Sequence, residues 1–110
     1  MIMHEIVKKE ASVLQPQLVE WRRALHQIPE VGIALPKTVQ FIKERLTEMD
    51  IPYQCYDEYS CFEATIGQGK RCFLLRSDID ALPLQEATNL SFASTNGCMH
   101  ACGHDLHGTI

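Results

Sequence analysis

The sequence contains no run of Lys and Arg, no internal repeat, and no apolar run near the ~20 residues that a membrane span needs. A net charge of −4 without a basic cluster argues against nucleic acid as the main partner. The first residues also lack the basic-then-apolar order of a signal peptide. We therefore expect a cytoplasmic protein with neither nucleic acid nor membrane as its partner.

No two of the five cysteines form a C-x-x-C pair. A closed four-ligand structural zinc site is therefore not expected, and a thiol-redox protein is the weakest functional hypothesis. An odd number of cysteines without a secretion signal predicts free thiols. The length of 110 residues, with 45% apolar and 22% charged residues, is typical of one globular domain.

Two helices are predicted in the first half of the chain. Apolar residues recur at helical spacing over residues 2–28, with a kink or a break expected at Pro16 and an end enforced by Pro29. A second helix is expected to begin at Pro36, which suits a first helical turn, and to end near Asp50.

Three strand-like runs follow, at residues 52–57, 61–66 and 71–76, and the glycines at 67 and 69 suggest a hairpin between the last two. The uninterrupted apolar run 72–75 predicts a central strand buried on both faces. Residues 76–97 are expected to be irregular. The predicted fold class is α/β, with two N-terminal helical segments packed on a small mixed or antiparallel sheet.

The densest chemistry lies at residues 98–107, where three His, two Cys and one Asp fall within ten positions. Thiolate and imidazole are good ligands for Zn²⁺ and similar ions, and Gly103 would let Cys102 and His104 turn toward one ion. Asp105 would accept a hydrogen bond from a ligand and orient it. Taken singly, each residue is more often a buried thiol or a hydrogen-bonded histidine, so clustering carries the hypothesis.

A second candidate group lies where the predicted central strand ends. Asp78 and Asp80 would point the same way if the strand continued, because side chains repeat every two residues. Carboxylates at strand ends are typical of α/β active sites, whereas aspartates also cap turns. This segment alone leaves both alternatives open.

Three segments together resemble one family. Residues 22–30, RRALHQIPE, are similar to its R-R-x-L-H-x-x-P-E signature, residues 76–83 to R-A-D-M-D-A-L-P, and residues 99–107 to M-H-A-C-G-H-D-x-H. The family is that of the aminoacylase-like metal-dependent amidohydrolases and metallopeptidases, which includes hippurate hydrolases, indole-acetyl-amino-acid hydrolases and N-acetyl-diaminopimelate deacetylases. The resemblance covers roughly residues 20–107, in matching order.

The resemblance implies that residues 1–110 are the N-terminal portion of a catalytic domain that binds two divalent metals, with the lid or dimerisation domain absent. Cys102 and His104 match metal ligands, and Asp78 matches a supporting acid that orients one. The residues expected to contact the metal ligands and orient them, without binding the metal, are Asp80, His100, Asp105 and His107. Zn, Mn, Ni and Co are not distinguished by this donor set. His26, Pro29 and Glu30 are expected to be structural.

The implied reaction is the hydrolysis of N-acyl amino acids. Family members are several times longer, and the general base and remaining ligands lie downstream of residue 110, so the chain alone is expected to be inactive. The alternative is a folded remnant that acts as a non-catalytic dimerising or binding module. An unpaired sheet edge would favour a homodimer, or else leave the chain marginally stable.

Overall fold

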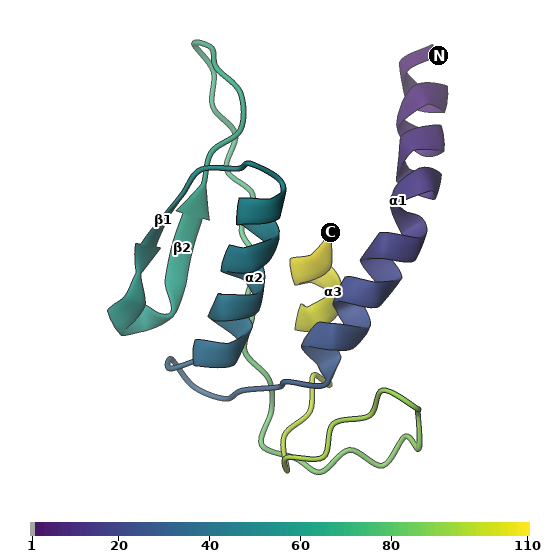
Figure 1. Cartoon of the computed structure of the whole chain (residues 1–110), viewed down its shortest axis with the longest axis vertical. Coiled ribbons are helices and arrows are strands. Elements are labelled where there is room, and N and C mark those ends of the chain that lie inside the picture. Colours follow the sequence, from purple (N-terminus) through teal and green to yellow (C-terminus); the bar gives the residue numbers. More distant parts are fainter. Residues whose placement is uncertain (1) are drawn as a thin grey trace.

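The computed structural model describes residues 2–110 apart from the side chain of residue 57. Two long helices, α1 (Ile2–His26) and α2 (Pro36–Glu48), come first. The strands β1 (Tyr53–Tyr56) and β2 (Cys61–Ala64) follow, separated by the short 3₁₀ helix η1 (Asp57–Tyr59). A long irregular stretch then leads to α3 (His104–Thr109), which lies against the lower half of α1 (Figure 1).

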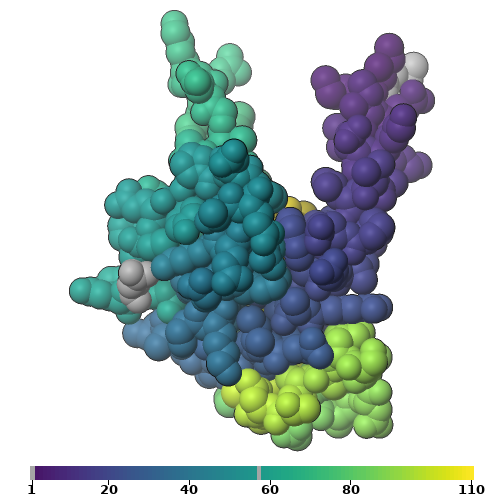
Figure 2. Space-filling model, viewed as in Figure 1, coloured from purple at the N-terminus to yellow at the C-terminus, as the bar shows by residue number. Residues whose placement is uncertain are grey.

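The first predicted helix is confirmed as one continuous element with Pro16 inside it. The ribbon of α1 changes direction partway along its length, as a missing backbone donor and a proline ring would cause (Figure 1). Among its described residues, burial is confined to the C-terminal end, at Leu25 and His26, and the other half projects from the body (Figure 2). Only the last turns of α1 therefore contribute to the core.

The start of α2 is fixed by a carboxylate from outside the helix. Pro36 occupies the first helical turn, as predicted, and Leu35 at the N-cap supplies no side-chain acceptor. Glu30 takes its place, accepting hydrogen bonds from the backbone N–H groups of Thr38 (2.7 Å) and Lys37 (3.2 Å). A negative charge near a helix N-terminus is also attracted by the positive end of the helix dipole. The structural role expected for Glu30 therefore has a physical basis.

The sheet is a two-stranded antiparallel hairpin in which Tyr53 lies opposite Ala64 and Tyr56 opposite Cys61. The predicted α/β fold class is confirmed, in its antiparallel form. The predicted third strand is wrong, because residues 71–76 pair with no other segment that the structure describes. The hairpin predicted at Gly67–Gly69 is wrong with it.

The predicted burial of residues 72–75 is wrong as well. Phe73, Leu74 and Leu75 are 88%, 89% and 96% exposed. An apolar run predicts that a segment is buried, but burial also requires other elements that pack against the segment. The described strands and helices leave both faces of this segment exposed.

The core lies where the end of α1, the start of α2, the irregular stretch and α3 meet. Among the described residues its buried apolar side chains are few: Leu25, Pro29, Leu35, Val39 and Ala81. Six buried polar or charged residues accompany them, namely His26, Thr38, Glu86, Ser94, His100 and Asp105. Hydrogen bonds and ion pairs among buried polar residues therefore contribute much of the stability that joins these segments.

The stretch between β2 and α3 is irregular apart from one isolated bridge between Leu82 and Met99, which confirms the loop predicted at residues 76–97. That bridge brings the segment after Asp80 against the segment before Cys102. Neither α1 nor any other described helix combines the length and apolar character needed to cross a membrane.

Candidate metal centre

The two predicted ligands flank a left-handed glycine at the start of α3. Gly103 has φ 83° and is the N-cap of the helix, Cys102 precedes it and is exposed, and His104 is the first helical residue. A residue with a side chain rarely adopts this conformation, so glycine is required at the turn. The turn between Cys102 and His104 that the sequence predicted is present.

Asp80 fixes the orientation of the His104 ring. The Nδ1 atom of His104 lies 2.8 Å from the backbone carbonyl oxygen of Asp80 and 3.0 Å from its carboxylate Oδ1. Both of these oxygens can only accept, so Nδ1 carries the proton. The other ring nitrogen, Nε2, then holds the lone pair that a metal ion needs.

Asp78 is not brought to this ring. Its carboxylate Oδ1 lies 2.7 Å from Nη1 of Arg76, in a pair whose side chains are 77% (Arg76) and 48% (Asp78) exposed. Asp78 and Asp80 would share a direction only if the strand continued through them, and it does not. The orienting role of Asp78 thus stays a prediction, while Asp80 makes the contact with His104.

The other two histidines of the cluster differ in their surroundings. His107 is exposed on α3. His100 is buried, and neither of its ring nitrogens has a hydrogen-bond partner among the described residues. Burial lowers the pKa of His100 below its ordinary value, and His26 and His104 lower it further against the opposing effect of Asp105 and Asp80. Burial therefore favours the neutral form of His100, which lines the same small cavity as His104.

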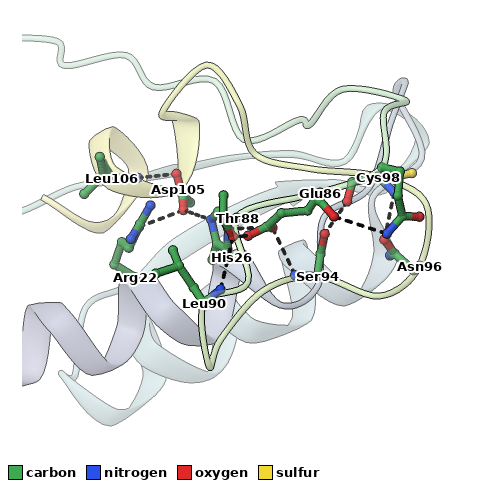
Figure 3. Close-up of polar contacts among 11 residues, drawn as sticks. Arg22, His26, Glu86, Thr88, Leu90, Ser94, Asn96, Cys98, Asp105 and Leu106 are labelled. Carbon is green, nitrogen blue, oxygen red and sulfur yellow. Dashed lines mark hydrogen bonds and ion pairs between the residues drawn. The ribbon is translucent and has the colours of Figure 1, made fainter.

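Asp105 belongs to a buried polar network with Arg22 and His26 (Figure 3). Its Oδ2 atom accepts hydrogen bonds from Nε of Arg22 (2.9 Å) and from Nδ1 of His26 (2.7 Å). The opposite ring nitrogen of His26, Nε2, lies 2.8 Å from Oε1 of Glu86. The side chains of Asp105 and Glu86 are fully shielded from solvent.

Glu86 is the residue that the sequence analysis missed. Burial by itself raises its pKa, but hydrogen bonds from the Thr88 hydroxyl and the Ser94 backbone N–H, together with the charge of His26, outweigh this and lower the pKa to about 2. A glutamate in a long loop carries no local signal of this environment. Only the pairing of residues 26 and 86, sixty positions apart, reveals it.

The donor set is incomplete within the described chain. No group of three or more His, Cys, Asp or Glu side chains in residues 2–110, leaving aside the undescribed side chain at 57, is placed to hold a metal ion. Cys102 and His104 supply two donors, one of them with a fixed tautomer. A catalytic zinc site usually has three protein ligands and an open position.

Comparison with known proteins agrees with this arrangement. The profile of "Peptidase family M20/M25/M40" matches residues 74–110. The chain is 41% identical to the N-acetyldiaminopimelate deacetylase of Lactococcus lactis subsp. cremoris, over 84% of this chain and 26% of that protein. It is 39% identical to an N-acyl-L-amino acid amidohydrolase of Geobacillus stearothermophilus, over 94% of this chain and 29% of that protein.

Among solved structures, the YXEP protein of Bacillus subtilis, described as a dinuclear metal-binding peptidase of the M20 family, superposes with a TM-score of 0.79. It is 38% identical over 89% of this chain and 28% of that one. Over these residues the fold is thus that of the corresponding part of an α/β peptidase. The chain is similar to members of the M20/M25/M40 peptidase family, and the resemblance to aminoacylase-like amidohydrolases is confirmed. It spans about a quarter of the length of the curated relatives it matches.

Proposed function

We propose that residues 1–110 are the N-terminal portion of the catalytic domain of a metal-dependent amidohydrolase that deacylates N-acyl amino acids in the cytoplasm. The observation that carries the proposal is the contact between Asp80 and His104, which leaves Nε2 of His104 as a lone-pair donor two residues from Cys102. The printed names of the relatives, a deacetylase and an N-acyl amino acid amidohydrolase, support the substrate class.

The residues present fit part of a divalent metal site. Cys102, as a thiolate, and His104 would hold the ion, and such a donor set suits Zn²⁺, Ni²⁺, Co²⁺ and, less well, Mn²⁺. When bound, a divalent ion polarises the amide carbonyl and lowers the pKa of a water molecule. The roles of this chain are narrower: Asp80 holds the proton on Nδ1 of His104, and Gly103 sets the turn between the two ligands.

We propose that the 110 residues alone are inactive. A general base must lie within hydrogen-bond reach of the proton it takes. Of the carboxylates near His104, Asp80 is committed to its ring and Asp105 to Arg22 and His26. Further ligands, the base and the lid would come from sequence outside these residues. An assay with N-acetyl amino acids and added Co²⁺ tests this, and turnover by the chain alone would contradict it.

Cobalt titration of the reduced protein tests the metal site itself. We expect weak binding of one ion, with an absorption band from thiolate-to-cobalt charge transfer, and tighter binding as pH rises because both ligands must lose protons. Cys102→Ser should abolish the band. Cys72→Ser is the matched control, since Cys72 is also an exposed free thiol but lies outside the cluster. Equal affinity in Cys102→Ser and the unmodified protein would refute the assignment.

A second candidate function, a dimerising module, is favoured by one observation. Three consecutive apolar side chains at residues 73–75 are almost fully exposed in an unpaired extended segment. Such a segment offers backbone groups and apolar area to a second copy of the chain. Sedimentation across a concentration series tests a homodimer, and a monomer at every concentration would refute it.

A further inference from the structure

The His26 ring lies between two carboxylates and also contacts an aromatic ring. Nδ1 contacts Asp105 and Nε2 contacts Glu86, at 2.7 and 2.8 Å, and the residue is 2% exposed. Phe92 meets the ring edge-on at 5.5 Å, and the guanidinium groups of Arg22 and Arg23 stack over the Phe92 ring. His26 is thus enclosed and has no access to a substrate.

The two hydrogen bonds indicate the protonation state of the His26 ring. A neutral imidazole has one N–H donor, and a carboxylate oxygen offers it none, so a neutral His26 would face one carboxylate lone pair to lone pair. An imidazolium donates to both. Arg22 and a charged His26 then balance Asp105 and Glu86, so that two cations face two anions in a site where an unpaired charge would be costly.

This pairing joins three segments that are far apart in the sequence. His26 is the last residue of α1, Glu86 belongs to the irregular stretch, and Asp105 is the second residue of α3 (Figure 3). A six-residue helix cannot persist without tertiary contacts. The placement of the first turn of α3, and so of His104, depends on what holds Asp105.

We propose that His26, as an imidazolium bridging Glu86 and Asp105, is a positioning residue that fixes the Cys102–His104 segment for metal binding. The inference rests on the proposed metal site. Its local part, the placement of the segment, is independent of any metal. His26 acts through Asp105 and the backbone and contacts neither candidate ligand.

The charge state is tested on the unmodified, metal-free protein by NMR of the ¹⁵N-labelled histidine rings near neutral pH. We expect two slowly exchanging N–H protons on His26, one on each ring nitrogen, because both are buried in hydrogen bonds to carboxylates. A single ring N–H on His26 would overturn the proposal. No substitution is needed, so this measurement does not depend on whether a variant folds.

Positioning is tested by hydrogen exchange in the His26→Gln variant, with His4→Gln, an exposed histidine on the same helix, as the matched control. Glutamine turns either its oxygen or its single amide group toward each carboxylate, so one contact is lost. The backbone N–H groups of Leu106 and His107 both donate to the carbonyl of Gly103 at 3.1 Å. We expect their exchange to accelerate at least about tenfold, while the N–H of Val39, bonded to Leu35 in α2, is unchanged.

An equal acceleration at Val39, or complete unfolding of the variant, would show that His26 stabilises the whole fold, and would overturn the positioning role. Unchanged exchange at Leu106 and His107 would overturn it as well. The cobalt affinity of His26→Gln should fall about tenfold, the lower end of what residues behind metal ligands contribute. If the unmodified protein binds no cobalt, the proposed metal function fails, whereas the exchange result still decides the role of His26.

Discussion

Replacing Glu86 by glutamine tests how much the buried network around His26 contributes to the free energy of unfolding. Glu86 accepts from Thr88, from the backbone N–H of Ser94 and from His26, with its side chain shielded from solvent. Glutamine keeps one acceptor oxygen, places an amide donor against existing donors, and leaves the charge of His26 half-paired. Breaking a buried pair costs about 3–5 kcal/mol. The retained acceptor favours the lower end, so we expect a loss of roughly 3 kcal/mol.

The assay is urea unfolding at pH 7, followed by fluorescence of Trp21 and by circular dichroism. For a urea dependence of about 2 kcal/mol per molar, a loss of this size lowers the unfolding midpoint by roughly 1.5 M. The matched control is Glu48→Gln, in which a 59% exposed carboxylate loses its ion pair with Arg45 and the cost should be at most ~0.5 kcal/mol. Equal midpoints for the two variants would refute the assigned weight of the network.

The pH dependence of the same experiment gives a second check. The pKa of Glu86 is about 2 in the folded chain against an ordinary value of 4.5, so the folded state binds fewer protons between these values. Its contribution is fully present above pH 4.5 and is lost as pH falls toward 2. The stability difference between the unmodified protein and Glu86→Gln should therefore shrink through that window. A difference independent of pH would mean that Glu86 is not held ionised by its partners.

Three further outcomes are expected. Asp80→Ala should weaken cobalt binding about tenfold, since the backbone carbonyl still holds His104, and Asp78→Ala should leave it unchanged, as measured by titration; the reverse result would restore Asp78 as the orienting acid. Glu30→Gln should destabilise the fold by about 1 kcal/mol in urea unfolding, because the N-terminus of α2 loses a charged acceptor. Leu75→Lys should reduce any self-association seen by sedimentation, since the side chain is 96% exposed in the unpaired segment; undiminished association would place the contact elsewhere.

Local signals in the sequence were sufficient for α1, for α2 and for the turn at the cluster, whereas η1 and α3 were not predicted. Pro36 marks the start of α2, and Gly103 marks the turn between Cys102 and His104, because each acts through its own backbone. The failure at residues 72–75 has a different cause. Apolar character predicts burial only when a partner surface exists, and that information lies outside the segment.

Side-chain partnerships were beyond the reach of the sequence for the same reason. His26 was expected to be structural, yet nothing near it indicates Glu86 or Asp105 as its neighbours. Asp78 and Asp80 would share a direction only if a strand continued through both, and the backbone there is irregular, with Asp80 contacting His104 and Asp78 contacting Arg76. Such contacts depend on tertiary folding between distant positions rather than on periodicity.

The composition of the core has a consequence for the response of the protein to temperature. Exposing apolar surface raises the heat capacity on unfolding and exposing polar surface lowers it. Among the described residues, a core with five buried apolar and six buried polar or charged side chains should therefore unfold with a heat-capacity increment below the ~1.3–1.6 kcal/mol per kelvin typical for this length. The stability curve would be shallow, so cooling and warming near its maximum would change the folded population little.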